Sequence, residues 1–395
     1  MLRQTPLHAR TAALCQGQNW RRWAGHVVAS SYELLPDREY YAIRSAAALI
    51  DVSPLFKYRV AGPDAARLLN RVVTRDISRC AVGQVMYTPW CDSAGKVIDD
   101  GTVSRLDDEI FRLTSGEPNL RWLHLNADGL DVTIEDESDS VAALSLQGPL
   151  SREVLSAAAD PGVEELRFFR LQEATISGVR VTITRTGYTG DLGYEIWMDA
   201  GNAVDVWDAV VEAGGPYGIV PTGLLAMDIA RIEAGLLLIS VDYVSANQAI
   251  IPSQFSSPLE LGLGWTVKLG KDRFVGRAAL RQESERGPEW LLRGLEIDWE
   301  SMERVYAEFG LPPQLPSVAW RTSVPVYSNG KQVGYATSGC WSPLLKKYVA
   351  LTHLQAPYAA PGTALSMEVT AEHHRRRADA TVVKTPFFNP ERKRA

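Results

Sequence analysis

The sequence lacks several patterns that mark common enzyme classes. Its four cysteines, Cys15, Cys80, Cys91 and Cys340, include no Cys-x-x-Cys pair, so neither a disulfide framework nor a zinc site is indicated. The six histidines show no His-x-His or His-Glu-x-x-His spacing. No GxGxxG or GxxxxGKS/T loop opens an expected helix, and no GxSxG elbow is present. We therefore expect no bound metal, and we disfavour nucleotide-dependent enzymes and α/β-hydrolases.

Long apolar runs and an excess of positive charge are also missing. No stretch of about 18 apolar residues occurs, and the start of the chain lacks the charged-then-apolar profile of a signal peptide. Acidic residues outnumber basic ones by 47 to 41, and the net charge of −6 gives no basic field to attract nucleic acid or anionic lipid. We expect a cytoplasmic protein that binds neither nucleic acid nor membranes.

The order of the expected elements favours an α+β fold. At about 150 residues per domain, the 395 residues suggest two or three domains. Strand–helix–strand segments mix with antiparallel hairpins over the first two thirds of the chain, which disfavours a doubly wound sheet. A charged, loop-like segment, Arg281–Pro288, then precedes a series of short strands typical of a compact β-barrel or sandwich. We place the domain boundary there, between residues 1–285 and residues 286–390.

Several local patterns give finer expectations. Apolar residues at three- and four-residue steps predict a helix over Ala65–Val73. Asp37 is a candidate cap for a helix that follows it, and the chain up to about Tyr32 reads as a partly irregular entry. Arg231 and Glu233, two positions apart on an expected helix, are interpreted as surface salt-bridge residues.

The stretch that stands out is Arg185–Ile196, which follows a strand-like run. Three glycines within seven residues mark a sharply turning backbone. Tyr188 stands between them, Tyr194 follows the last, and Glu195 lies at the start of the next strand. Such a turn can offer a flat ring for stacking and a carboxylate for the donor edge of a heterocycle. A hairpin whose tyrosines belong to the core fits the same pattern.

Two adjacent acids interrupt another strand. Neighbouring residues of a strand point to opposite faces, so one of Asp99 and Asp100 is expected to face solvent and the other to point inward. An inward carboxylate needs partners or a ligand. An exposed hairpin end is the alternative. His373 and His374 precede three arginines, which favours a wet hairpin tip over a metal site.

Taken together, the segments resemble the aminomethyltransferase (glycine cleavage T-protein) family. The matching stretches fall in family order over nearly the whole chain: Ile50–Ser53, Val60–Pro63, Gly95–Asp100, Leu146–Pro149, Arg185–Ile196, Arg231–Gly235, Ser257–Lys268, Thr337–Pro343 and Val383–Phe387. The resemblance implies a three-subdomain ring, with two interleaved α+β subdomains and a last small β-barrel, around a bound tetrahydrofolate. It also implies an enzyme that moves a one-carbon unit from a small donor onto folate.

The resemblance also assigns roles to six residues. Asp100 matches the acid beside the folate nitrogens where transfer occurs, and Glu195 matches the carboxylate that pairs with the pterin. Four further positions match residues that contact folate or line its cavity: Tyr87, Tyr188, Trp265 and Leu55, the last in place of a methionine.

The departures from the family pattern gather on the donor side and folate-tail side of the implied site. Pro54-Leu55 replaces His-Met, Met227 replaces an arginine, Leu236 replaces a tyrosine, and Ile239–Ser245 replaces a Tyr-Gly-Gln-acid-Met-Asp segment. We therefore keep two enzymatic alternatives. One is a T-protein working with a lipoyl carrier protein, and the other is a tetrahydrofolate-dependent O-, N- or S-demethylase of a small methylated compound. A non-enzymatic folate-binding protein is a third alternative, although the Lys-Gly-Cys-Tyr motif of such relatives is absent.

Overall fold

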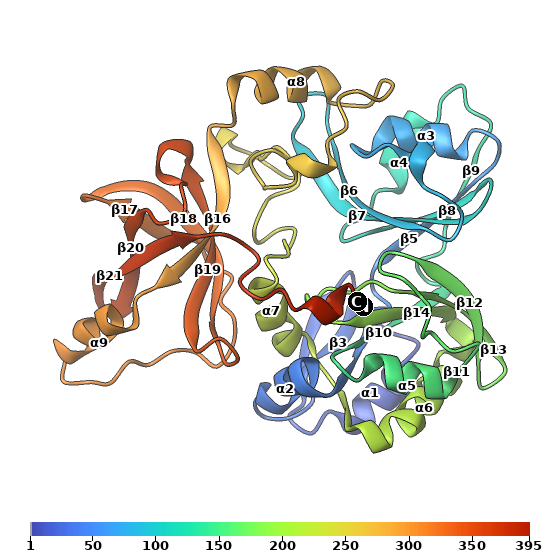
Figure 1. The fold of residues 1–395 in the computed structure, drawn as a ribbon, viewed down its shortest axis with the longest axis horizontal. Helices are drawn as coiled ribbons and strands as arrows, with labels where there is room; N and C mark the ends of the chain where they lie inside the picture. The colour runs from blue at the N-terminus through green and yellow to red at the C-terminus, as the bar shows by residue number, and fades with distance from the viewer. Residues whose placement is uncertain (1) are drawn as a thin grey trace.

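The computed structural model describes residues 2–395 and shows three lobes arranged around a common centre (Figure 1). One lobe is built on a seven-stranded sheet, one on a five-stranded sheet, and one is a closed six-stranded barrel. The expected α+β ring with a C-terminal barrel is confirmed. The division at residues 285 and 286 stays a prediction about independent folding units. Within residues 2–395, no helix has the length and apolar character needed to span a bilayer.

The seven-stranded sheet carries one wall of the centre. Its order is β11 (Ala159–Asp160), β12 (Leu171–Ile176), β13 (Val179–Thr184), β14 (Gly193–Asp199), β10 (Val141–Gln147), β4 (Ala47–Asp51) and β15 (Ile219–Pro221). Helices α2 (Asp37–Ser45), α5 (Ser151–Ala158) and α6 (Ala203–Gly214) belong to this lobe (Figure 1). Strand β10 is paired on both edges and is buried on both faces, and the burial explains its nearly unbroken apolar run.

The five-stranded sheet carries the second wall. Its order is β6 (Val85–Cys91), β7 (Val97–Asp107), β8 (Ile110–Ser115), β5 (Phe56–Ala61) and β9 (Thr133–Asp136). Helices α3 (Ala65–Val72) and α4 (Leu120–Asn126) contribute Leu68, Leu69 and Leu123 to its core. The predicted helix over residues 65–73 is therefore confirmed to within one residue.

The barrel closes the ring. Its order is β16 (Trp290–Ile297), β19 (Lys347–Gln355), β18 (Lys331–Ser342), β17 (Val324–Ser328), β20 (Ala364–Ala371) and β21 (His374–Val383), with α9 (Trp299–Ala307) packed on its outside. The turn between β20 and β21 lies at Glu372 and His373, so the predicted hairpin tip is confirmed. After β21 the chain returns to the centre and ends beside the seven-stranded lobe (Figure 1).

Three local expectations were wrong. The first 32 residues form helix α1 (His8–Leu14) and a small sheet of β1 (Arg3–Gln4), β3 (His26–Ser31) and β2 (Asn19–Trp23). Helix α8 (Arg277–Arg286) covers most of the segment read as a loop, because its arginine, glutamine and glutamate residues favour helix despite their charge. Helix α2 begins at Asp37 after Pro36, so Asp37 is not its cap.

Helix α7 (Leu224–Glu233) lies between the lobes and corrects the interpretation of its charged residues (Figure 1). Arg231 and Glu233 are not at the surface but fully buried. Glu233 accepts from Arg44 Nη2 at 2.6 Å and from the Tyr40 hydroxyl at 2.6 Å, and Ser342 of the barrel donates to it as well. Because α7 is packed on several sides at once, both of its ends face protein rather than water. The pattern of the helix alone does not reveal this.

Replacing Arg44 with methionine should lower the free energy of unfolding by about 3–5 kcal/mol. The Glu233 and Asp191 carboxylates stay buried, and both lose the guanidinium of Arg44 as a partner. Chemical denaturation followed by circular dichroism measures the change. Arg304→Met, which removes a solvent-exposed pair with Asp379, is the matched control and should move the midpoint little. Equal effects of the two changes would contradict the assigned role of the buried pair.

Candidate active site

A single cavity of about 1410 Å³ lies where the three lobes meet. Residues of all three lobes and of the irregular segment after α7 line it. The six residues singled out from the sequence all reach it: Leu55, Tyr87, Asp100, Tyr188, Glu195 and Trp265. Positions separated by up to 210 residues of chain are therefore brought to one space.

Asp100 projects from β7 and is held by two tyrosines. The Tyr87 hydroxyl donates to Oδ2 at 2.8 Å, and the Tyr243 hydroxyl donates to Oδ1. Burial raises the pKa of the Asp100 carboxyl, while the hydrogen bonds from Tyr243 and Tyr87 lower it. The result is a carboxyl group in a fixed orientation whose pKa lies above the ordinary range of an aspartate.

Asp99 does not face solvent as expected, but is fully buried. Its carboxylate accepts from the Glu117 amide at 3.0 Å and from Asn119 Nδ2 at 2.8 Å. The exposed-hairpin alternative is thus wrong for this pair. The reason is that residues 116–119 fold back over the outer face of β7. The alternation of residues along a strand does not indicate whether a distant loop will cover one of its faces. Both acids line the cavity, but Asp99 is fully buried and bound to the loop, whereas Asp100 is partly exposed to the cavity.

Glu195 projects from β14 into the same cavity. Its Oε2 accepts from Thr186 Oγ1 at 2.6 Å, and Thr184 Oγ1 lies 3.5 Å away. Burial raises the pKa of Glu195, and the threonine hydroxyls oppose that shift. Among residues 2–395 no lysine, arginine or histidine forms a salt bridge with it. A partly exposed carboxylate with free acceptor capacity therefore faces the cavity.

The glycines of the turn before β14 are required by close contacts. A Cβ on Gly187 would lie 2.1 Å from Gln147 Oε1, and one on Gly193 would lie 2.2 Å from the same atom. Gly190 has a φ of +74°, which favours glycine. Gln147 fills the inside of the turn, and this packing places Tyr188 and Glu195 on its cavity side. Tyr194 is a core residue, as the plainer interpretation of the turn allowed.

Aromatic rings form part of the cavity wall. Tyr87 and Trp265 are stacked with centroids 6.2 Å apart and an interplanar angle of 27°. Trp265 remains 56% exposed, and the guanidinium of Arg75 lies 5.4 Å from its ring centroid. Tyr188 donates its hydroxyl hydrogen to the Leu237 carbonyl, which fixes its ring. Such flat surfaces suit a planar aromatic ligand.

Leu55 lies in a loop held by a buried lysine. Lys57 Nζ donates to the carbonyl oxygens of Ser53 and Leu55, each at 2.7 Å. Burial lowers the pKa of Lys57 to about 8. The lysine thus donates its hydrogen bonds to the backbone of the loop, which holds Leu55 at the cavity.

Tyr243 is the residue that sequence reasoning missed. It lies in the segment Ile239–Ser245, which departs from the family pattern, so no motif marks it. Its neighbour Asp242 is buried and accepts from Thr337 Oγ1 at 2.6 Å, from Ser338 Oγ at 2.7 Å and from Arg231. These bonds tie the loop to the barrel and to α7. They deliver the Tyr243 hydroxyl to Asp100 across 143 residues of chain.

Metal chemistry finds no support in the side-chain arrangement. Over residues 2–395, no group of three or more histidine, cysteine, aspartate or glutamate side chains is placed to hold an ion. The cavity combines carboxyl groups, among them those of Asp100 and Glu195, with hydroxyl groups, aromatic rings and arginine and lysine side chains.

Comparisons with known proteins identify the architecture. The GCVT N-terminal domain matches residues 7–271, and the glycine cleavage T-protein C-terminal barrel domain matches residues 308–389. An aminomethyltransferase from Halothermothrix orenii is 34% identical, covering 89% of this chain and 90% of that protein. A trimethylamine-oxide aldolase from Ruegeria pomeroyi is 35% identical over the whole of this chain, which spans 48% of that longer protein. The crystal structure of the glycine cleavage system aminomethyltransferase T from Bartonella henselae has a TM-score of 0.82 at 25% identity, over 98% of this chain and 99% of that one.

These matches define an enzyme of the transferase class that moves one-carbon units. The chain belongs to the glycine cleavage T-protein family. The resemblance drawn from the ordered sequence segments is therefore confirmed, and with it the fold that it implied.

Thr186→Val should raise the pKa of Glu195 further, because it removes the hydrogen bond that most favours the ionised carboxylate. The carboxylate band in infrared pH titrations, assigned by comparison with Glu195→Gln, reports the change. Thr182→Val, on β13 before the turn that carries Thr186 and bonded to the exposed Glu173, should leave that band where it is. A Thr186→Val titration identical to that of the unchanged protein would show that the threonine does not control Glu195.

Proposed function

We propose that this chain binds tetrahydrofolate in the central cavity and transfers to it a one-carbon unit from a small donor. The observation that carries the proposal is the pair of carboxyl groups, Asp100 and Glu195, which reach one cavity from two different lobes. Neither makes a salt bridge within residues 2–395, so no cation of the protein competes with a ligand for either carboxyl group. Family membership supports the same conclusion.

The pterin end of folate fits the surroundings of Glu195. The aminopyrimidine edge of a pterin offers two parallel N–H donors, and one carboxylate can accept both. The threonine pair leaves the second oxygen of Glu195 free of protein partners. Tyr188, Tyr87 and Trp265 would bind the flat ring system, and Leu55 would contact its edge. Tetrahydrofolate would supply the weakly basic nitrogen that accepts the carbon.

Asp100 would handle the proton that this nitrogen loses. A carboxyl group with a raised pKa can take a proton and pass it on near neutral pH. Tyr87 and Tyr243 hold both of its oxygens, which fixes its direction. General acid–base help of this kind contributes about 10²–10⁴-fold to a rate.

The donor side favours a small methylated compound over an aminomethyl group on a lipoyl carrier. Met227 and Leu236 replace polar residues of the family pattern, and Tyr243 approaches Asp100 from the segment that differs most. A relative named for a methylated amine oxide shares the whole length of this chain. We therefore place demethylation of an ether, amine or thioether first. The carrier-dependent glycine cleavage reaction is the alternative that the aminomethyltransferase relatives support.

Asp100→Asn should reduce kcat by about 10²–10⁴-fold while the Kd for tetrahydrofolate changes little, because the amide cannot take a proton. Single-turnover assays and calorimetry separate the two effects. Unchanged turnover would remove Asp100 from the mechanism.

Glu195→Gln should weaken tetrahydrofolate binding by about 10–100-fold, as expected for the loss of a charged hydrogen-bond pair of roughly 1.5–3 kcal/mol. Calorimetric titration measures the affinity, and Glu173→Gln on the exposed face of the same sheet is the control. A Kd equal to that of the unchanged protein would rule out Glu195 as the pterin partner.

Tyr243→Phe should move the acid limb of the kcat/KM profile to higher pH. The Tyr243 hydrogen bond lowers the pKa of Asp100, so its loss raises that pKa, and the ionised form then appears only at higher pH. Tyr87→Phe should shift the limb in the same direction, and Tyr217→Phe, outside the Asp100 hydrogen bonds, should not. A shift of the acid limb to lower pH would mean that the Tyr243 hydroxyl does not lower the pKa of Asp100. An unmoved acid limb with the alkaline limb shifted to higher pH would mean that the protonated form of Asp100 is the active one.

A further inference from the structure

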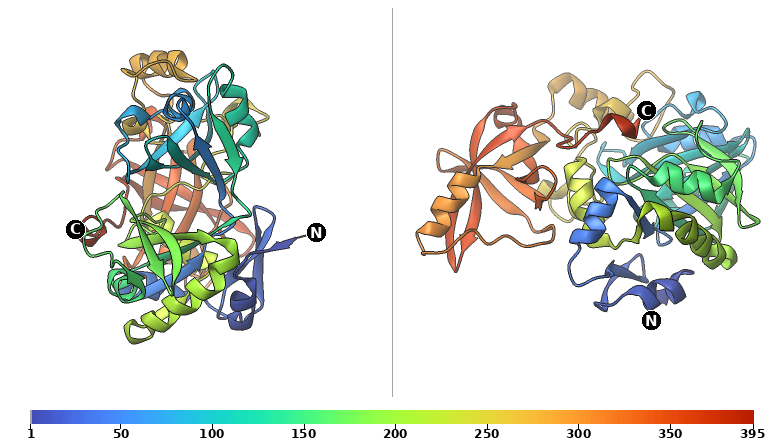
Figure 2. Two further views of the ribbon diagram at one scale, coloured as in Figure 1. Left: turned by 90° about the vertical axis from the view of Figure 1, so that its right-hand side faces the viewer. Right: turned by 60° about the horizontal axis from the view of Figure 1, so that its bottom comes forward.

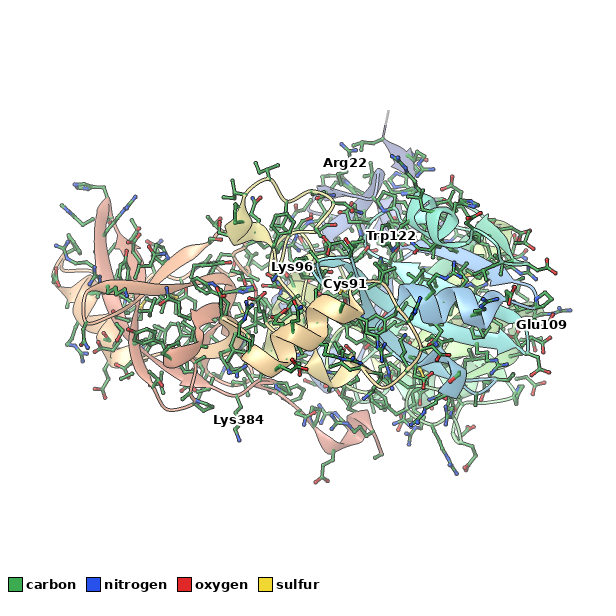
Figure 3. The ribbon with its side chains drawn as sticks, turned by 90° about the horizontal axis from the view of Figure 1, so that it is seen from above. Arg22, Cys91, Lys96, Glu109, Trp122 and Lys384 are labelled. Carbon is green, nitrogen blue, oxygen red and sulfur yellow. The ribbon has the colours of Figure 1, made fainter. Side chains whose placement is uncertain are left out.

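The central cavity reaches two opposite faces of the ring. Arg22 and Lys384 both line it, and Figure 3 shows these two residues on opposite sides of the molecule. Figure 2 shows the same relation for the chain segments that carry them, since the N-terminal hairpin and the C-terminal residues lie on opposite faces. The cavity is therefore a passage with two mouths, which we call the arginine mouth and the lysine mouth.

The arginine mouth carries unpaired positive charge. Arg21 and Arg22 come from β2, and Arg321 comes from the segment that leads into the barrel. Arg321 Nε lies 2.7 Å from Asp228 Oδ2, but that carboxylate also pairs with the buried Arg231 at 2.9 Å. Arg231 binds Asp242 as well. Arg231 and Arg321 thus share Asp228 and Asp242, and Arg21 and Arg22, which form no salt bridge within residues 2–395, add two positive charges.

Arg21 is the cation best placed for a ligand. It is half-buried, and its only hydrogen bond to a side chain within residues 2–395 runs from Nε to Ser30 Oγ at 3.2 Å. It forms no salt bridge there. Burial lowers its pKa, and the charge of Arg321 acts in the same direction, so the two guanidinium groups lie close enough to repel each other. An anion between them would relieve that repulsion.

The lysine mouth is built differently. Lys384, Lys393 and Arg394 line it from the last residues of the chain, and none of them forms a salt bridge within residues 2–395. Burial and the neighbouring Arg394 lower the pKa of Lys393. Lysine ammonium groups on flexible chains suit a mobile carboxylate tail of variable position, whereas arginine forks suit one fixed, planar carboxylate.

A folate held at Glu195 has one carboxylate-bearing tail, so it can neutralise only one mouth. We propose that the tail takes the lysine mouth and that the one-carbon donor is itself a carboxylate, bound by Arg21 and Arg321 at the arginine mouth. This inference rests on the proposed function. Trp23, Leu55 and Met227 form one apolar cluster with Leu224 beside these arginines, and that wall suits the methyl-bearing body of such a donor.

The exchange balances without an oxidant or reductant. The bond between the donor's heteroatom and its methyl carbon breaks, and that carbon bonds to the folate nitrogen. The proton lost by the nitrogen passes by way of Asp100 to the donor's heteroatom. The donor class is therefore a small acid that carries a methoxy, methylamino or methylthio group.

The test compares Arg21→Gln with Lys384→Gln in the full chain. The donors are methoxyacetate, dimethylaminoacetate and methylthioacetate, each beside its neutral amide, and the folates are tetrahydrofolate and tetrahydropteroate, which lacks the glutamate tail. Calorimetry gives Kd for each folate and, on the folate-loaded protein, for each acid and amide. Turnover gives KM and kcat. Arg21→Lys, which keeps the charge but loses the fork, guards against a folding defect in Arg21→Gln.

The unchanged protein should bind at least one acid about tenfold or more tightly than its amide. Arg21→Gln should weaken the binding of that acid by about 10–100-fold and remove the preference over the amide. The Kd for tetrahydrofolate should stay within about twofold of that of the unchanged protein. The affinity of Arg21→Lys for the acid should lie between that of the unchanged protein and that of Arg21→Gln. Lys384→Gln should weaken the binding of tetrahydrofolate but not that of tetrahydropteroate, and it should leave the binding of the acid unchanged.

Three results would overturn the inference. If Arg21→Gln weakens tetrahydrofolate but not tetrahydropteroate, the arginine mouth holds the folate tail. If folate-loaded protein binds amides as well as acids, or binds none of them, the donor is not a small carboxylate. If one-carbon transfer occurs only from an aminomethylated lipoyl carrier, the donor is the carrier. Failure of the proposed function looks different, because the unchanged protein would then bind neither folate.

Discussion

The structure depends on the buried charges of helix α7. Arg231 pairs with Asp228 and Asp242, and Glu233 pairs with Arg44, so one helix binds the loop that carries Tyr243, the seven-stranded lobe and the barrel. Buried ion pairs are tolerated only where hydrogen bonds satisfy nearly every polar atom. That demand fixes how the lobes meet, because a small shift of any lobe would leave a buried charge without a partner. A ring held in this way can keep an open cavity at its centre.

The open centre gives two ordinary carboxyl groups, those of Asp100 and Glu195, unusual surroundings. Asp100 and Glu195 are partly exposed to the cavity yet remote from bulk water, so burial raises both pKa values while hydroxyl groups of tyrosine and threonine hold their oxygens. The two acids sit on different lobes and differ in their partners. Asp100 accepts hydrogen bonds from two tyrosines, and Glu195 accepts them from threonine hydroxyls. The two carboxyl groups therefore have different environments, which is why we propose different roles for them.

The ring also carries cations at both mouths of its cavity. Arg21, Arg22 and Arg321 stand at one mouth, and Lys384, Lys393 and Arg394 stand at the other. Asp100, Glu195, Tyr87, Tyr188 and Trp265 match the family pattern, while the segment Ile239–Ser245 and Met227 depart from it. In the proposed function, the matching residues serve folate and the departing ones face the donor.

The sequence by itself determined the α+β class and most strands, because apolar periodicity and turn residues are local properties. Its C-terminal pattern left a barrel and a sandwich open, and the structure closes those strands into a barrel. The glycines of Arg185–Ile196 and the acids of β7 also marked the site, since their residue types are rare in plain strands. Tertiary structure alone decided that Arg231 and Glu233 are buried, that Asp99 is covered by the loop at Glu117, and that Tyr243 reaches Asp100. Each of these depends on contacts between segments far apart in the chain, and the burial and partners of a side chain are set by such neighbours rather than by its own sequence.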